Sequence, residues 1–199
     1  VLRSTGITLG ATAATTSILL NPVTNAGGFA LITIQVDDGE FTQSTTIGLT
    51  VTPVNDTPTI FTHNTVLLTN EDKPLTTQVL INDIDTDFTS MTLWATSSNQ
   101  SLVTDAGISL PALPAAVSGL VINPQPNANG TALITVTVSD GSLERSTSFN
   151  LTVNPVNDPP QITAFTAIVN TNEDQTTTMA IGISDIDTPF AKLPLFGTS

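Results

Sequence analysis

Acidic side chains are the residues of this chain best suited to bind or react, and most of them occupy matched positions. Of the 17 Asp and Glu residues, twelve fall at six positions that each recur 102 residues later. The four Lys and Arg residues do not recur in this way. The matched pairs are Asp38 and Asp140, Asp56 and Asp158, Glu71 and Glu173, Asp72 and Asp174, Asp83 and Asp185, and Asp85 and Asp187.

Carboxylates kept in phase with a repeat suggest a bound cation. Like charges that lie close together in a fold cost stability unless something positive joins them. Lys and Arg are too few for that role, so a metal ion is the better candidate. A hard cation with oxygen ligands fits this set of side chains, and we therefore expect calcium, Ca²⁺, as the cofactor.

The amino-acid composition excludes several classes of binding partner. The 199 residues carry a formal net charge of -13 and contain no cysteine. Nucleic acid and anionic membrane surfaces both require clusters of Lys and Arg, so neither is expected as a partner. No apolar stretch has the length of a membrane-spanning helix, and we expect no membrane insertion within this segment. Without disulfides, a metal is the remaining way to reinforce a small domain.

The repeat divides the chain. Residues 30–36 match residues 132–138, and Val54-Asn55-Asp56 matches Val156-Asn157-Asp158. A proline-containing run follows the last strand of each unit, and prolines stiffen such connections. The predicted division is residues 1–53 as the C-terminal half of one repeat, 54–155 as a complete repeat, and 156–199 as the N-terminal half of the next.

The period within the complete repeat is two residues, as in half-buried antiparallel strands. Apolar residues alternate with Thr in 134–138 and with Asn and Thr in 149–153, and Ser139-Asp140-Gly141-Ser142 connects the two as a hairpin. No segment has a helical period. We predict an all-β fold of tandem, seven-stranded Greek-key β-sandwiches of immunoglobulin-like size. The other expected strands lie around residues 60–68, 75–81, 91–97, 102–110 and 117–123.

One aromatic position also recurs. Trp94 is matched by Phe196, and both are predicted on the third strand. Such sandwiches bury an aromatic ring there, so we expect Trp94 in the core, with a ligand-stacking platform as the alternative.

Four short motifs occur in the same order in each unit: Val-Asn-Asp-x-Pro, Asn-Glu-Asp, Asp-Ile-Asp and Asp-Gly. This set resembles the cadherin-like repeats of bacterial and archaeal surface proteins and large adhesins, and more distantly the animal cadherin repeat. The resemblance covers the whole chain. It implies immunoglobulin-like sandwiches in series, with calcium between successive domains.

The resemblance also assigns metal ligands. For the linker after the complete repeat it implies Glu71, Asn157, Asp158, Asp185 and Asp187. For the earlier linker it implies Asn55, Asp56, Asp83, Asp85 and, in the strand hairpin, Asp140. Pro53 and Pro155 replace an acid of the animal linker, so we expect fewer ions than an animal cadherin junction holds, about one or two.

Plainer interpretations exist for these residues. The acids could form a solvated surface whose recurrence reflects duplication alone. Asp72, Asp174 and Asp140 could be turn residues. His63 is the only histidine, which leaves a catalytic triad or a zinc site little to build on. Paired carboxylates could serve a glycosidase, but here they recur in every unit, so we expect no enzyme.

The favoured function is structural: an extracellular or cell-surface segment of a calcium-stiffened filament, stalk or adhesin shaft. The alternatives are an adhesive module that binds a glycan or a cell-surface protein, and an accessory domain of a secreted enzyme. The expected partners are neighbouring copies of the same repeat, arranged head to tail as in a fibre.

The two half-repeats should not be stable alone, because each exposes an apolar face. We expect uncovered Ile181 and Ile183 in one half, and Ile32, Ile34 and Val36 in the other. Two arrangements would cover them. Either the repeats of one continuous array cover each other, or separate chains complete each other's sandwich head to tail.

Overall fold

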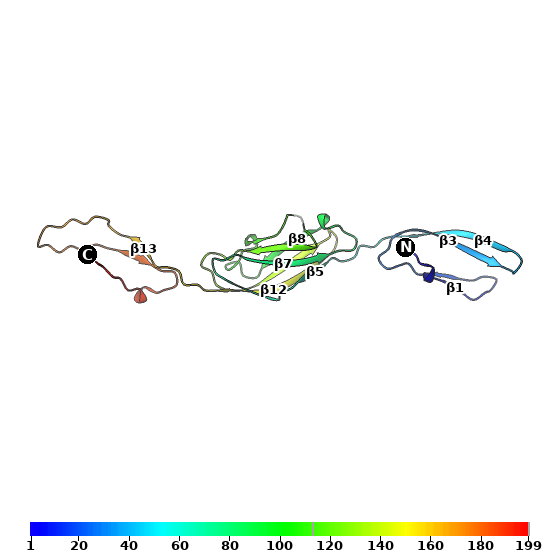
Figure 1. Cartoon of the computed structure of the whole chain (residues 1–199), viewed down its shortest axis with the longest axis horizontal. Coiled ribbons are helices and arrows are strands. Elements are labelled where there is room, and N and C mark those ends of the chain that lie inside the picture. Colours follow the sequence, from blue (N-terminus) through cyan, green and yellow to red (C-terminus); the bar gives the residue numbers. More distant parts are fainter. Residues whose placement is uncertain (113, 199) are drawn as a thin grey trace.

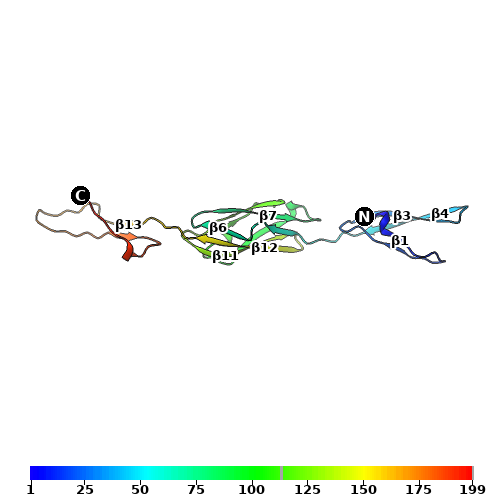
Figure 2. The same cartoon turned by 60° about the horizontal axis from the view of Figure 1, so that its bottom comes forward.

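The computed structural model describes residues 1–112 and 114–198, and it is elongated. Residues 1–53 lie at one end of the long axis and residues 156–198 at the other, with the central residues 54–155 between them (Figures 1 and 2). Strands make up the regular structure, together with a few short 3-10 turns, so the all-β prediction is confirmed. No helix in the described part of the chain is both long and apolar enough to cross a membrane.

Residues 54–155 contain two four-stranded sheets. Their strand orders are β5-β7-β10-β9 and β6-β12-β11-β8, so neighbouring strands are often far apart in the chain. Two short helices, η2 (Phe88–Ser90) and η3 (Asp105–Gly107), connect them. The strands are β5 (Thr59–Thr62), β6 (Val66–Asn70), β7 (Leu75–Asn82), β8 (Thr92–Ser97), β9 (Ile108–Ser109), β10 (Val117–Ile122), β11 (Gly130–Ser139) and β12 (Glu144–Asn154).

The longest pairing is the predicted hairpin of β11 and β12. Its register runs from Gly130 opposite Val153 to Ser139 opposite Glu144. Gly141 has a φ of 95°, a value that glycine adopts at no steric cost, which explains Asp-Gly in the turn. β12 also pairs with β6, in parallel, so the start of the repeat is joined to its end.

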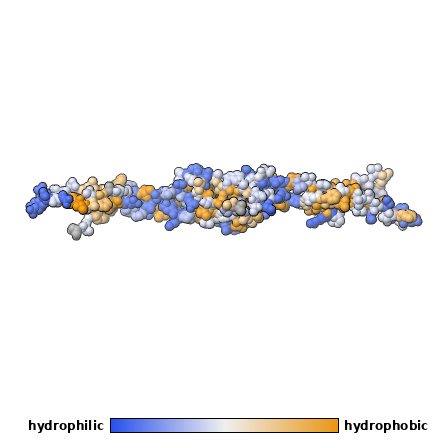
Figure 3. Space-filling model, turned by 90° about the horizontal axis from the view of Figure 1, so that it is seen from above, coloured by the Kyte–Doolittle hydropathy of each residue, from blue (hydrophilic) through white to orange (hydrophobic). Residues whose placement is uncertain are grey.

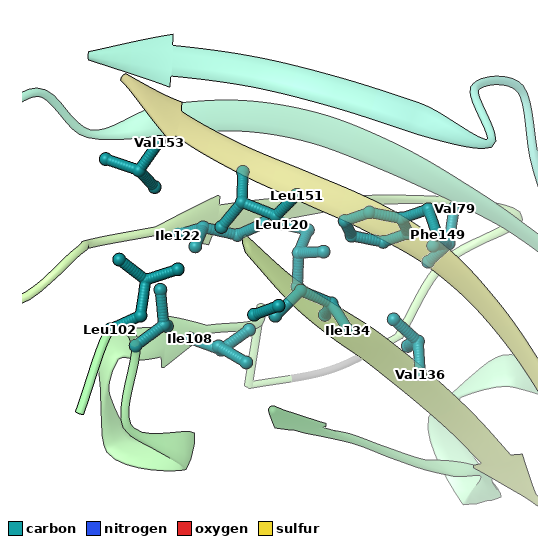
Figure 4. Packing of buried hydrophobic residues seen from close by; sticks show 12 residues of the cluster. Val79, Leu102, Ile108, Leu120, Ile122, Ile134, Val136, Phe149, Leu151 and Val153 are labelled. Carbon is teal, nitrogen blue, oxygen red and sulfur yellow. The ribbon is translucent and has the colours of Figure 1, made fainter. Parts of the chain in front are cut away.

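A hydrophobic core fills the space between the two sheets (Figure 4). It includes Leu120 and Ile122 from one sheet, and Ile134, Phe149 and Leu151 from the other. A smaller cluster of Ile81, Met91 and Val138 continues the core toward the first linker. Every second residue of the facing strands contributes, which is the burial pattern that the period of two predicts.

Two strand predictions differ from the structure. The strand expected over 60–68 is divided into β5 and β6, which belong to different sheets. The strand expected over 102–110 is reduced to β9, because η3 precedes it and the Thr104 hydroxyl caps that turn by accepting the N–H of Gly107. Both runs contain several apolar residues, but such a run does not show where the chain bends.

The prediction of a buried Trp94 is wrong. Its side chain is 38% exposed, on β8 opposite Thr137. Its neighbours Leu93 and Ala95 pack against the core instead. Since successive side chains of a strand point to opposite faces, Trp94 lies on the outer face of the sheet.

The two end segments contain only two-stranded sheets. One segment carries η1 (Ser4–Gly6), β1 (Ile7–Leu9), β2 (Ile18–Leu20), β3 (Gly28–Asp37) and β4 (Thr42–Val51), with β1 paired to β2 and β3 to β4. The other carries β13 (Gln161–Ala164), β14 (Gly182–Ser184) and η4 (Phe190–Lys192), with β13 paired to β14.

Apolar side chains of these end segments are largely uncovered. Val36 and Ile181 are exposed, as the sequence predicts, and Ile34 and Ile183 are half-buried. Ile32 is buried, so that part of the prediction is wrong. Among residues 156–198 whose side chains the structure describes, none is buried.

Candidate metal centres at the two junctions

The predicted ligand residues gather at the two linkers that flank residues 54–155. We call the set around the earlier linker the first junction, and the set around the later linker the second junction. The first junction comprises Asn55, Asp56, Asp83, Asp85 and Asp140. The second junction comprises Glu71, Asn157, Asp158, Asp185 and Asp187.

The Asp-Ile-Asp motif forms the same bend at both junctions, directly after β7 and after β14. Asp83 Oδ1 accepts the backbone N–H groups two and three residues later, each at 2.8 Å. Asp185 Oδ1 accepts the equivalent groups at 2.9 and 2.7 Å. A carboxylate that bonds the following backbone in this way stabilises a tight turn. The first Asp of each motif therefore has a structural role in the bend.

The second Asp of each motif is bonded to the linker. Asp85 Oδ2 accepts the backbone N–H of Asp56 at 2.7 Å, and Asp187 Oδ2 accepts that of Asp158 at 2.6 Å. The two bonds are equivalent in the repeat, so the same local sequence builds the same contact twice. The bend and the linker Asp are thereby brought together at both junctions.

Glu71 joins the central repeat to the second linker. It follows β6, is only 3% exposed, and accepts the backbone N–H of Val156 through Oε1. Its other oxygen accepts a longer bond from the Asn129 side chain at 3.4 Å. A buried carboxylate needs partners for its charge, and the linker backbone supplies one of them.

The surroundings of Asp158 at the second junction disfavour its charged form. Burial raises the pKa of Asp158 above its ordinary value, and the charges of Asp187, Asp72, Glu71 and Asp185 raise it further. Its Oδ2 atom is buried and accepts no hydrogen bond from the described residues. A buried oxygen without a donor, among carboxylates, is suited to a cation.

The first junction has its own buried oxygen without a hydrogen bond, Asp83 Oδ2. Asp140, in the hairpin turn, accepts the side-chain N–H of Asn55 at 2.8 Å. The N–H of Leu143 and then the Asn55 amide lower the pKa of Asp140. Asp140 therefore acts as a turn residue and also contacts the linker.

Three further residues lie next to the second junction and were not among the predicted ligands: Asp72, Asn127 and Asn129. Asp72 has a positive φ of 57°, as expected for a turn residue, and its Oδ1 accepts the N–H of Asn127 at 3.0 Å. Asn127 also has a positive φ, 55°, and its counterpart Asn25 has 57°. That recurrence is visible in the sequence and could have identified the loop before β11.

Each junction contains a hollow lined by these residues. The hollow of the second junction measures about 500 Å³, and that of the first about 170 Å³. The larger one is lined by Asn127, Asp158, Pro159, Gln161, Ser184, Asp185 and Ile186. Polar oxygen atoms thus line a space accessible from solvent.

The side chains do not form a closed coordination shell as they lie. Within residues 1–112 and 114–198, no three His, Cys, Asp or Glu side chains are close enough together to bind one metal ion. The Asn157 amide is used locally, donating to the carbonyl of Asp158 at 2.9 Å. The available donors are nevertheless all oxygen atoms of carboxylates, amides and backbone, the ligand type that calcium prefers.

Comparison with known proteins gives one family. The profile of the family described as "Bacterial Ig domain" matches residues 55–154. No curated protein matches the chain.

Solved structures show likeness at low identity. Domains 4 and 5 of the S-layer protein SbsC are 17% identical, with 76% of this chain and 78% of that chain covered and a TM-score of 0.42. The titin domains Z1Z2 in complex with telethonin are 13% identical, with 75% and 72% covered and a TM-score of 0.42. The endo-fucoidan hydrolase MfFcnA4 of glycoside hydrolase family 107 is 20% identical, with a TM-score of 0.38. The match covers 77% of this chain but only 23% of the hydrolase chain. These values are too low to transfer a function to this chain.

Proposed function

Because this chain belongs to the bacterial Ig domain family, we propose that it is a structural segment of an extracellular or cell-surface protein, whose sandwiches are stiffened by calcium at their junctions. The observation that carries the proposal is Asp158, with its buried, unbonded oxygen and its pKa raised by burial and by four neighbouring carboxylates. A carboxylate in such surroundings favours a bound cation over remaining ionised alone.

At the second junction the candidate ligands come from three parts of the chain. Glu71 belongs to the central repeat, Asp158 to the linker, and Asp185 and Asp187 to the segment beyond it. Calcium would supply the positive charge that these side chains lack. Ligands shared between three parts would restrict the motion of one part against another, so a hinge would become a rod.

At the first junction Asn55, Asp56, Asp83 and Asp85 would bind calcium between the linker and the residues that follow it, because the bend and the linker contact are repeated there. Asp140 adds a further carboxylate from the hairpin turn, and the Asn55 amide already bonds it. Two equivalent junctions in one chain favour a mechanical role along its length over a single binding pocket.

The proposed role is not catalytic. His63 packs edge-on against the Phe61 ring, with ring centroids 6.2 Å apart. The hollow beside it is lined by Asn64, Thr76, Thr77, Gln78 and Leu80, without a carboxylate to orient the imidazole.

The proposal is tested by thermal and chemical unfolding of the chain in calcium and in chelator. Binding to the native state stabilises it by about 2.7 kcal/mol at a roughly hundredfold excess of ligand over the dissociation constant. We expect calcium to raise the midpoint, and the particle in solution to become longer and stiffer by small-angle scattering. Unfolding curves that superimpose in calcium and chelator would contradict the proposal.

A matched pair of variants separates ligand loss from charge loss. Asp185→Asn with Asp187→Asn removes two carboxylates at the second junction, whereas Glu40→Gln with Glu144→Gln removes two exposed acids that have no counterpart in the repeat. We expect weaker calcium binding by calorimetry in the first double variant and unchanged binding in the second. Equal effects would show that calcium responds to net charge alone.

A further inference from the structure

A hollow in the side of the central repeat takes no part in the proposed calcium binding. It measures about 510 Å³. Its lining residues are His63, Asn64, Thr76, Thr77, Gln78 and Leu80. All six belong to the complete repeat, and none is a candidate ligand of either junction.

The hollow opens where the chain crosses from one sheet to the other. β5 pairs with β7 only as far as Thr62. Three residues later the carbonyl of Thr65 already accepts the N–H of Asn150, on β12 of the other sheet, at 2.9 Å. β7 begins at Leu75, so residues 75–78 have β10 on one side and, within the described part of the chain, no strand on the other.

The backbone of two β7 residues faces this open edge. The N–H of Ile81 donates to the carbonyl of Ala116, directly before β10, at 3.0 Å. Successive residues of a strand direct their backbone polar groups to opposite edges, so those of Thr76 and Gln78 point away from β10. They lie at the edge that β5 has left, where a ligand can bond them.

Two side-chain amides lie at the same edge. Asn64 and Gln78 are exposed, and within residues 1–112 and 114–198 neither amide takes part in a hydrogen bond. Other amides of the repeat are engaged: that of Gln100 donates to the Ser97 carbonyl and to Asp105, at 2.8 and 2.7 Å. A free amide can donate and accept at once, as the hydroxyl groups of a sugar require.

Apolar surface borders these polar groups. The His63 ring meets the Phe61 ring edge-on, and Phe61 is 58% exposed. Leu80, opposite Phe61 in the β5–β7 pair, is also exposed. The face of an aromatic ring is electron-rich and attracts the C–H groups on the apolar side of a sugar ring.

The charge of the surroundings favours an uncharged ligand. None of the six lining residues is an acid, Lys or Arg, and the chain has a net charge of -13. A field of this sign repels sulfated or carboxylated ligands. The face seen in Figure 3 is largely hydrophilic over the central repeat, so a polar, uncharged ligand fits this surface best.

An added peptide strand is the other ligand that a free edge can take. Only Thr76 and Gln78 present backbone groups here, because β5 occupies the edge from Val79 onward and β7 begins at Leu75. Two residues are fewer than an ordinary strand supplies. A short edge surrounded by amides and hydroxyl groups suits the small polar groups of a sugar better.

We propose that this hollow binds one unit of an uncharged oligosaccharide. The backbone groups of Thr76 and Gln78 and the amides of Asn64 and Gln78 bond the sugar hydroxyl groups, and the His63–Phe61 pair covers its apolar face. This binding function goes beyond the structural role and does not involve calcium.

The proposal is tested by titrating the full chain with uncharged hexasaccharides of glucose, mannose, galactose and N-acetylglucosamine, followed by the NMR signals of the backbone amides. We expect at least one sugar to shift the signals of Thr76 and Gln78 until they saturate. No such shift with any of these sugars at millimolar concentration overturns the proposal. Shifts there with a Thr-rich pentapeptide, and with none of the sugars, would assign the hollow to strand addition and overturn it as well.

A double variant identifies the side chains involved. Asn64→Ala with Gln78→Ala should weaken binding of the sugar about tenfold, because hydrogen bonds to it are lost. The fold does not require these amides, since Thr166 and Ala180 stand at the matched positions 102 residues later. Asn150→Ala removes an exposed amide from the other sheet and is the control that should bind normally. Normal binding by the double variant would overturn the proposal.

Two further measurements separate the alternatives. Binding that is lost in Trp94→Ala but kept in the double variant would place the sugar on the outer face of β8, which overturns the proposal. A sulfated galactose hexasaccharide should bind more weakly than the uncharged one. Equal or tighter binding of the sulfated sugar would overturn the assignment to an uncharged ligand.

Discussion

The central repeat and the two end segments carry the same apolar positions but bury them to different degrees. Val138 is covered from both sheets, whereas Val36, 102 residues earlier, is mostly exposed. The β-strand pattern is the same, and both hairpins pair over ten residues in the same register. A period of two thus specifies which side chains face inward, and burial requires the strands of both halves of the repeat.

The junctions give a second comparison. The bend after β7 and the bend after β14 make the same hydrogen bonds, although one follows a complete sheet and the other a two-stranded one. The acidic motif therefore builds its local structure without a finished core. Local bonds form the bend, whereas the core requires strands distant in sequence.

The largest expected effect tests the difference in burial. Phe149→Ala should reduce the free energy of unfolding of the central repeat by about 3–5 kcal/mol, because a large buried side chain is removed and a cavity remains. Ile47→Ala, at the matched position, should cost much less. Chemical denaturation of both variants at low concentration, in chelator, measures the difference. Equal losses would show that Ile47 is already buried in solution.

The next prediction compares the junctions. Asp185→Asn with Asp187→Asn should abolish the part of the calcium stabilisation that comes from the second junction, and Asp83→Asn with Asp85→Asn should do the same at the first. We expect the second junction to contribute more, because Glu71 joins it from the central repeat. Calorimetric titration of both double variants gives the two contributions, and strand content by circular dichroism should persist in each.

The Asp158 carboxylate should destabilise the folded chain in chelator and contribute to calcium binding when the metal is present. Its pKa is raised in the folded chain, so the stability associated with its protonated form is present below its unfolded pKa and is lost as pH rises through the folded pKa. Asp158→Asn should therefore stabilise the chain at neutral pH in chelator, and weaken calcium binding. Unfolding curves across pH in both conditions measure this; a loss of stability in chelator would contradict it.

Asp140 should behave in the opposite way and with a smaller effect. Its pKa is lowered by the Leu143 N–H and by Asn55, so its contribution is present above the unfolded pKa and is lost as pH falls through the folded pKa. Asp140→Asn should reduce stability slightly at neutral pH, with or without calcium. Asp38→Asn is the matched control, because Asp38 makes the same turn bonds and accepts no side-chain hydrogen bond from the described residues.

The site could be predicted where its residues are close in sequence and repeated. Asp83 and Asp85 share one bend, so spacing alone places them together. The Asn127 loop was missed because its contact with Asp72 joins residues 55 positions apart. Glu71, which contacts Val156 85 positions away, is assigned to this junction only by the family resemblance, as a metal ligand. Sequence spacing does not reveal contacts of this range without a homologous template.

Local preference and repetition were sufficient for the all-β class, the Asp-Gly hairpin and the phase of the carboxylates, since each depends on alternation or on turn chemistry within a few residues. Three features required the packing of both sheets: the division of the first strand into β5 and β6, the outward position of Trp94, and the burial of Val138 but not of Val36. Each depends on which distant strand covers a face. Two segments with the same alternation of apolar residues therefore differ in burial when the strands packed against them differ.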